Sequence, residues 1–309
     1  MTIREMFAGG PLLSDGAWGT QLQARGLAIG ECADGWNLSN PEAVRAVAGS
    51  YAEAGSRVLL TNTFRASPLA LAGFGLAERT AAINTEGVRL SREAAARAGA
   101  FVFASVGPSG KTMATGEVTE EELRRSFSVQ CEALASAQPD ALLLETFGDL
   151  EEARIALSAA KATGLPTIVS FAFFAGGMRD RTASGVTPEQ AAIAMEEAGA
   201  DAVGANCGNG IESFADICRR MRAATTLPLW MKANAGIPEM ANGTVRYLTT
   251  PDDFASHLAA LLAAGADFVG GCCGTSPDFI RALAKRWPET TLAERKKQES
   301  GACESPSCL

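Results

Sequence analysis

Residues 262–273 read LAAGADFVGGCC, and this stretch holds both the repeating unit of the chain and its most unusual pair of residues. A helical pattern ends at a turn of small residues with glycine, which is the usual stop of a helix. A short apolar strand follows, and two adjacent cysteines between glycines come directly after it. Neighbouring side chains of a regular strand point to opposite faces. Both sulfurs can therefore reach one point only where the backbone leaves strand geometry, which glycine permits.

The same unit of helix, small-residue turn and apolar strand recurs along the chain. It reads AEAGSRVLLTN at 52–62, ARAGAFVFASV at 96–106, ASAQPDALLLET at 135–146 and EEAGADAVGANC at 196–207. Such short apolar runs are typical of strands that are buried on both faces of a parallel sheet. We expect eight strands, at 11–15, 57–62, 101–106, 140–145, 166–172, 201–206, 228–233 and 267–271.

A helical pattern follows each predicted strand, and several of these patterns carry start signals. The signals are Asn40-Pro41, Thr119 with Glu122, Thr187-Pro188 and Thr250-Pro251. Eight strand–helix units predict a single (β/α)8 barrel, the TIM barrel, over residues 1–288. A doubly wound open sheet is the alternative, but no GxGxxG follows any predicted strand.

The composition limits the partners and the location that we expect. The chain has 309 residues, a formal net charge of -8 and a pI of about 4.9. This acidic balance argues against nucleic acid or an anionic membrane surface as the main partner. The N-terminus MTIREMFAGG does not resemble a signal peptide, and no apolar run has the length of a membrane span, so we expect a cytoplasmic protein. Residues 289–309 are polar and are expected to form a mobile tail.

Three cysteines at strand ends predict a metal site. Cys207 ends the run GANC, and Cys272 and Cys273 lie in GGCCGT. Because the C-terminal ends of barrel strands meet at one face, the three sulfurs are expected to converge there. Zinc with three protein ligands and one open position is a catalytic arrangement, whereas structural zinc usually has four. We expect one Zn2+ per chain at this face, with a structural zinc site or three plain buried cysteines as alternatives.

The chain has one histidine, His257, which lies inside the helical pattern DDFASHLAALLAAG. That position makes it an improbable ligand or base, so Ser–His–Asp and Cys–His mechanisms are not expected.

Polar residues at other strand ends suggest a small-molecule site beside the metal. Asp15 opens the turn DGAWGT and Glu145 ends the apolar strand ALLLE, while Asn62 and Ser105 end two further strands. The two acids could hold an ammonium group, and the backbone N–H groups of the glycine-containing turn could bind a carboxylate. The set fits an α-amino acid. The alternatives are an ordinary Asp-Gly turn and a structural pairing of Glu145 with Lys232 or another base.

Six motifs together resemble the homocysteine S-methyltransferase family over roughly residues 5–288. They are DGAWGTQLQ at 15–23, TNTF at 61–64, SVGPSG at 105–110, ETF at 145–147, GANC at 204–207 and GGCCGT at 270–275. This family includes betaine–homocysteine methyltransferase, S-methylmethionine–homocysteine methyltransferase and the homocysteine-binding module of cobalamin-dependent methionine synthase.

The resemblance implies a zinc-dependent enzyme that methylates the thiol of homocysteine to give methionine. Cys207, Cys272 and Cys273 match the zinc ligands of the family, and the zinc-activated homocysteine thiolate is the nucleophile. Asp15 and Glu145 match the acids that hold the homocysteine amino group. The backbone N–H groups around Ala17 and Trp18 fall where the substrate carboxylate is bound.

The methyl donor has two candidates. Aromatic residues that could line the mouth of the barrel would suit a small sulfonium or quaternary ammonium compound. These residues are Trp18, Trp36, Phe64, Phe171, Phe173 and Phe174. The N-terminal motifs look closest to the methionine synthase module, which favours a separate methyl-corrinoid protein.

Two further hypotheses concern the zinc itself. The protein could instead be a barrel whose zinc is structural or sensory, with another thiol or amino-acid ligand. A thiol of the tail, Cys303 or Cys308, could also occupy the open zinc position in the resting enzyme.

Overall fold

A computed structural model describes residues 1–241 and 244–287 and shows eight parallel strands in one sheet. The sheet order is β1-β10-β7-β6-β5-β4-β3-β2. Its strands are β1 Leu12–Leu13, β2 Val58–Leu60, β3 Phe101–Val106, β4 Ala141–Phe147, β5 Thr167–Phe171, β6 Ala202–Cys207, β7 Leu229–Ala233 and β10 Phe268–Gly271. All eight predicted strands are thereby confirmed. The predicted tail with Cys303 and Cys308 lies outside the described residues.

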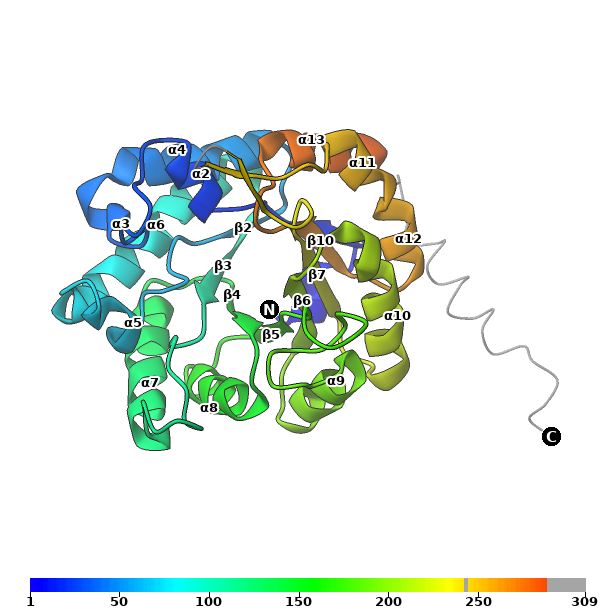
Figure 1. Cartoon of the computed structure of the whole chain (residues 1–309). Coiled ribbons are helices and arrows are strands. Elements are labelled where there is room, and N and C mark those ends of the chain that lie inside the picture. The colour runs from blue at the N-terminus through cyan, green and yellow to red at the C-terminus, as the bar shows by residue number, and fades with distance from the viewer. Residues whose placement is uncertain (242–243, 288–309) are drawn as a thin grey trace.

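The sheet closes into a barrel at a narrow seam (Figure 1). On one side, β1 pairs with β10 through Leu12–Phe268 and Leu13–Val269. On the other side, a single parallel bridge joins Ser14 to Val58 of β2, supported by the N–H of Asp15, which donates to the carbonyl of Val58 at 3.0 Å. The bridge nearly closes the sheet, and the arrangement confirms the predicted (β/α)8 barrel.

Helices surround the sheet on its outer side, as Figure 1 shows. They are α2 Gly19–Gln23, α3 Trp36–Ser39, α4 Pro41–Glu53, α5 Pro68–Ala72, η1 Ala77–Arg79, α6 Thr80–Ala98, α7 Glu120–Ser136, α8 Leu150–Lys161, α9 Pro188–Glu197, η2 Ile211–Ser213, α10 Phe214–Ala224, α11 Pro251–Ser256, α12 Leu258–Ala263 and α13 Pro277–Arg286. The predicted starts of α4, α7, α9 and α11 are confirmed. Thr119 and Thr187 both cap their helices through a capping box, with Glu122 and Gln190 as partners.

Large aromatic rings fill the interior of the barrel. The rings of Phe103, Trp230 and Phe268 lie 5.4–5.9 Å apart from one another. The short helix α1, Ile3–Met6, adds two apolar side chains to this cluster. Since the N-terminus lies at the barrel axis in Figure 1, this helix covers the end of the barrel where the strands begin. The opposite end, where the strands stop, is left for polar residues.

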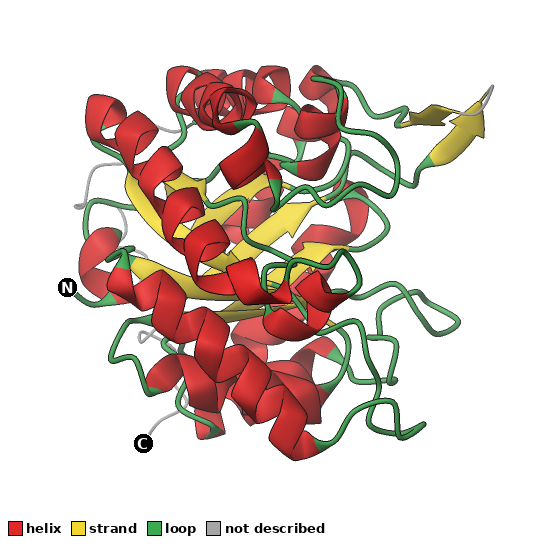
Figure 2. Cartoon of the chain, turned by 90° about the vertical axis from the view of Figure 1, so that its left-hand side faces the viewer, coloured by secondary structure: helices red, strands yellow, loops and turns green. Residues whose placement is uncertain are grey.

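Two features differ from the expected pattern. The segment after β7 forms an antiparallel hairpin, β8 Glu239–Ala241 and β9 Thr244–Arg246, which projects from the strand-end side of the barrel (Figure 2). The helical pattern around the lone histidine is divided at His257 into α11 and α12.

Among the described residues, no helix is both long and apolar enough to cross a bilayer.

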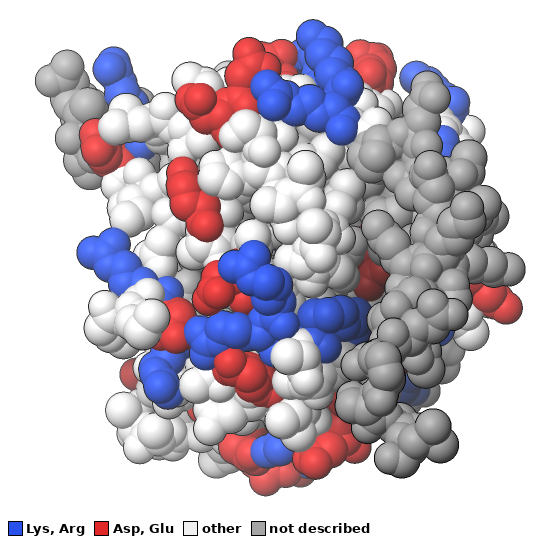
Figure 3. All heavy atoms as spheres, turned by 90° about the vertical axis from the view of Figure 1, so that its right-hand side faces the viewer, with Lys and Arg blue, Asp and Glu red and all other residues white. Residues whose placement is uncertain are grey.

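The outer surface mixes both signs of charge. Figure 3 shows basic and acidic side chains interleaved on the side of the barrel that carries α10 and α12. Arg220 of α10, for example, contacts Glu189 at 2.5 Å and Asp180 at 2.7 Å, and the guanidinium lowers the pKa of Glu189 to about 2. These pairs tie α10 to α9 and to the loop that follows β5.

Candidate active site

The candidate site follows from the two-residue period of the strands. Phe103, Leu143 and Trp230 belong to the interior cluster of the barrel. Side chains two positions further along a strand lie on the same face. Ser105, Glu145 and Lys232 therefore also point into the barrel, one layer nearer its C-terminal end, and the same argument applies to Ser170 and Asn206 of β5 and β6. Apolar side chains occupy the lower layers and polar side chains the upper one.

The structure brings the three predicted cysteines together at this end. The Sγ atom of Cys207 lies 3.1 Å from that of Cys272 and 3.8 Å from that of Cys273. Cys207 ends β6 with a φ of 61°, a left-handed conformation that is uncommon for a residue other than glycine. Cys272 and Cys273 follow β10 in a turn, where the N–H of Cys272 donates to the carbonyl of Ala233 and the N–H of Ala235 donates to that of Cys273. The turn aims both adjacent sulfurs at Cys207.

Gly274 lets the turn lie against an aromatic ring. A Cβ atom at this position would come within 2.3–2.5 Å of ring atoms of Tyr247, and the φ of Gly274 is 81°. Burial, followed by the nearby sulfur atoms, raises the pKa of Tyr247 to about 12. Tyr247 was not among the predicted site residues, because nothing in the sequence of its loop indicates where the ring packs.

The electrostatics of the cluster favour a bound cation. The hydrogen bond to Cys272, the second thiol at Cys273 and burial all hold the pKa of Cys207 well above its usual range. Hydrogen bonds from Cys207 and Cys272 lower the pKa of Cys273. Three thiols this close together cannot all ionise without a positive charge between them. Within the described residues, Cys207, Cys272 and Cys273 form the one group of cysteine, histidine or acidic side chains that meets the geometry of a metal site.

A side-chain amide beside the backbone of Cys207 and Gly208 has a buried oxygen without a partner in the described residues. Asn234 follows β7, and its Nδ2 donates to the carbonyl of Gly208 at 2.9 Å. Its Oδ1 is buried and has no hydrogen-bond partner among the described residues. Asn234 was not among the predicted site residues. A buried amide oxygen without a partner is costly, so a ligand for it is expected.

Asn206 connects the cysteines to the strand that carries Glu145. Its Oδ1 accepts from the N–H of Thr146 at 2.8 Å and from Ser170 Oγ at 2.7 Å. Its Nδ2 donates to Thr146 Oγ1 at 2.6 Å and to Cys272 Sγ at 3.8 Å. Thr146 has a φ of 66°, which is strained for a β-branched residue. One amide therefore links β4, β5, β6 and the turn after β10.

Both carboxylate oxygens of Asp15 already have partners within the protein. Its Oδ1 lies 2.5 Å from the ammonium nitrogen of Lys232. Its Oδ2 accepts from Trp18 Nε1 at 2.9 Å and from the N–H of Leu60 at 2.8 Å. The side chain is completely buried. Lys232, which was considered as a partner of Glu145, pairs with Asp15 instead.

Glu145 is held more loosely. Its Oε1 accepts from Ser105 Oγ at 2.5 Å, and its Oε2 has no hydrogen-bond partner within the described residues. Burial, partly offset by the charge of Lys232, raises the pKa of Glu145 to about 7. The predicted neighbours Ser105 and Glu145 thus lie together, with one carboxylate oxygen left for a ligand.

Other predicted substrate residues are partly committed to the fold. The N–H of Ala17 donates to Thr275 Oγ1 at 3.1 Å, whereas the backbone N–H of Trp18 has no partner among the described residues. Asn62 Nδ2 donates to the carbonyl of Ala33 and to Asn37 Oδ1, so this amide fastens a loop. Trp18 therefore keeps a backbone donor for a ligand.

Most of the predicted aromatic lining is used for packing. Phe171 and Phe173 are buried in the core outside the barrel interior, and Trp36 is buried with its Nε1 donating to Glu31 at 2.7 Å. Phe64 lies against Gly107. Phe174 is 47% exposed and is the most accessible of the six.

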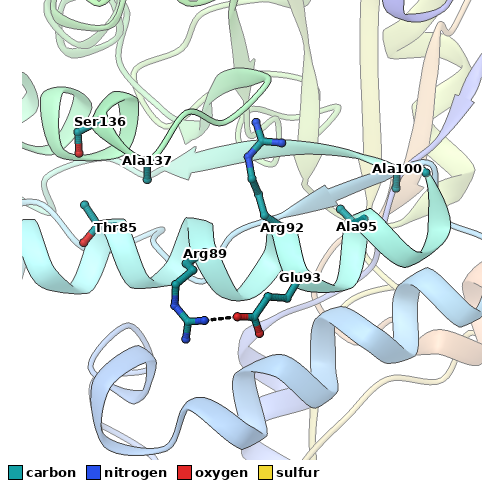
Figure 4. Close-up of a pocket in the computed structure, with 10 residues that line it drawn as sticks. Thr85, Arg89, Arg92, Glu93, Ala95, Ala100, Ser136 and Ala137 are labelled. Carbon is teal, nitrogen blue, oxygen red and sulfur yellow. Dashed lines mark hydrogen bonds and ion pairs between the residues drawn. The ribbon is translucent and has the colours of Figure 1, made fainter.

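A cavity of about 710 Å3 lies elsewhere, on the outer helices α6 and α7 near the start of β3 (Figure 4). Its charged side chains are already paired, since Arg89 contacts Glu86 and Glu93, and Arg92 contacts Asp140 at 3.5 Å. It lies at the end of the barrel where strands begin, away from the cysteines, and therefore carries no part of the site.

Comparison with known proteins agrees with this geometry. The family model described as homocysteine S-methyltransferase matches residues 12–287. The chain belongs to the homocysteine S-methyltransferase family. The match includes every strand of the barrel and all three clustered cysteines. It confirms the family that the motifs indicated, and with it the expected class of enzyme.

The relatives of this family member differ in length. Methionine synthase of Mycobacterium tuberculosis (strain ATCC 25618 / H37Rv) is 27% identical over 311 residues, which cover 96% of this chain and 26% of the relative. Methionine synthase of Mycobacterium leprae (strain TN) is 27% identical over 297 residues, which cover 91% and 25%. The chain thus spans about a quarter of the curated relatives that it matches.

A solved structure of similar size also matches. The metallated form of the homocysteine methyltransferase MmuM from Escherichia coli superposes with a TM-score of 0.75 at 28% identity. The match covers 90% of this chain and 96% of MmuM. The barrel of this homocysteine S-methyltransferase family member is therefore shared with an enzyme of nearly the same extent.

Proposed function

We propose that the protein transfers a methyl group to the thiol sulfur of homocysteine and releases methionine, with one zinc ion held by Cys207, Cys272 and Cys273. The observation that carries this proposal is the convergence of three sulfurs, all within 4.8 Å of one another, at the strand ends of a barrel of this family.

The donor set fits zinc. Three sulfur ligands leave one position open, which a thiol substrate could occupy. When bound, zinc would keep the substrate sulfur deprotonated and nucleophilic near neutral pH, where a free thiol with a pKa of about 8.5 is mostly protonated. No protein side chain then needs to act as a base on the thiol.

The protein's own residues would orient the amino-acid end of the substrate. Glu145 Oε2 is free to accept hydrogen bonds from an ammonium group, while Ser105 fixes Oε1. The unpaired N–H of Trp18 would bind the carboxylate. Asn206 keeps Cys272 and the Glu145–Thr146 segment in a fixed relation. Holding both ends of the substrate aligns its sulfur with the incoming methyl group.

The donor class is the second part of the proposal. A small sulfonium or ammonium donor and a separate methyl-corrinoid protein both follow from the family resemblance. A donor screen decides between them. Betaine, S-methylmethionine, S-adenosylmethionine, dimethylsulfoniopropionate and free methylcobalamin would each be offered with homocysteine, and methionine would be measured.

Zinc content and X-ray absorption spectroscopy test the central claim. We expect one zinc per chain, with three sulfur neighbours that become four when homocysteine is added. Cys272→Ala should lose zinc and methionine formation, whereas Cys131→Ala, a buried cysteine of α7 outside the cluster, should keep both. An unchanged sulfur count on adding homocysteine would favour a structural or sensory zinc and overturn the proposed reaction.

A further inference from the structure

Lys232 is a buried cation in the middle of the candidate site. It is 1% exposed and is the only lysine or arginine among the buried residues of the described chain. Its ammonium group contacts Asp15 and lies 5.6 Å from the ring centroid of Trp230, below it in the barrel. A buried charge needs a partner, and Asp15 is the only carboxylate within 4.0 Å of Lys232 in the described part of the chain.

The pairing occupies Asp15. Three donors converge on this carboxylate: Lys232 Nζ, Trp18 Nε1 and the N–H of Leu60. The first is a charged donor, the third is part of the backbone, and the carboxylate has no exposed surface. An incoming ammonium group would have to displace Lys232 and leave that charge unpaired, which is strongly unfavourable.

Glu145 offers the opposite situation. It receives one hydrogen bond, from Ser105, and its second oxygen has no partner in the described residues. It lies in the same layer of the barrel as Asn206, whose amide contacts Cys272. With Asp15 paired to Lys232, Glu145 is the carboxylate of this layer that remains for the positive charge of an amino acid.

We propose that Lys232 is a specificity-determining residue of this site. Because its ammonium group forms an ion pair with Asp15, Glu145 is the one acid that can bind the ammonium group of the substrate. This inference rests on the proposed function and refines it. Asp15 and Lys232 then form an ion pair without net charge that positions other residues. The family resemblance instead implies that Asp15 and Glu145 both hold the amino group of the substrate. The preferred substrate is a thiol that carries exactly one α-ammonium group opposite Glu145.

Isothermal titration calorimetry on the zinc-loaded full chain tests this division of roles. The two ligands are homocysteine and 4-mercaptobutyrate, which has the same thiol and carboxylate but lacks the amino group. A hydrogen bond to a charged group predicts that the wild type prefers homocysteine by roughly 10- to 100-fold. In Glu145→Gln, which keeps an acceptor for Ser105, this preference should fall to near unity.

The matched variant removes the other pair of charges together. Asp15→Asn with Lys232→Met leaves no buried ion unpaired, so it should weaken both ligands alike and keep the roughly 10-fold or greater preference for homocysteine. A full preference in Glu145→Gln overturns the inference, and this variant decides the matter even if the double variant does not fold. Loss of the preference in the double variant alone would also overturn it. A zinc-loaded wild type that binds neither thiol would refute the proposed function and the inference with it.

Discussion

Replacing Asn206 by alanine should destabilise the barrel by about 3 kcal/mol, at the upper end of the range for a single substitution. The amide makes three hydrogen bonds of 2.6–2.8 Å, two to Thr146 and one to Ser170, in addition to its contact with Cys272. Each buried hydrogen bond contributes about 1 kcal/mol net, so the loss is about 3 kcal/mol. Thr146 would also lose the contacts that hold its left-handed conformation.

Urea denaturation in the presence of a reductant measures this loss. The control is Ser170→Ala, which removes one of the three bonds and leaves the amide in place, and it should cost about 1 kcal/mol. Zinc content, measured in parallel, should fall in Asn206→Ala because Cys272 loses its amide donor. Equal free energies of unfolding for the two variants would show that the amide is not the link between these strands.

Three further outcomes are expected. Burial raises the pKa of Asp34 from 3.8 to about 6, so this carboxyl costs the native state about 3 kcal/mol as the pH rises from 4 to above 6. Comparing Asp34→Asn with the wild type across this range should reveal a loss that is larger in the wild type by about this amount, and parallel stability curves would contradict it. Gly274→Ala should be clearly less stable than Gly99→Ala, because both positions have positive φ but only the first places a Cβ within 2.3 Å of Tyr247, and similar melting temperatures would count against this packing. Zinc at about 100 times its dissociation constant should stabilise the wild type by about 2.7 kcal/mol and leave Cys272→Ala unchanged, a difference that thermal unfolding with and without a chelator would detect.

The barrel was predictable because the same short pattern of helix, small-residue turn and apolar strand recurs along the sequence. Each strand is a short apolar run, most often after a turn of small residues, and the predicted and observed bounds agree within two residues at every strand end. The capping residues Thr119 and Thr187 marked helix starts for the same reason. The convergence of Cys207 with Cys272 and Cys273 also followed, since strand ends in a barrel share one face.

The pairing of side chains inside the site was not predictable in this way. Lys232 and Asp15 are 217 residues apart, and only the closed barrel brings them together. The sequence offered Lys232 as a partner for Glu145, because both lie at strand ends and have opposite charge. The division at His257 was missed because no glycine or proline marks it. The hairpin of β8 and β9 was missed although its sequence, EMANGTVR, contains an Asn-Gly pair, which is a strong hairpin signal.

The seam of the barrel restricts how this protein could change its substrate. β1 contains only two residues, and the carboxylate of Asp15 beside it accepts the N–H of Leu60 in β2 while it holds Lys232 in β7. One side chain thus spans strands on both sides of the closure. Loss of the Asp15 carboxylate would remove contacts on both sides of this closure. Changes of acceptor thiol are therefore expected to arise through Glu145 and Ser105, whose replacement leaves these contacts intact.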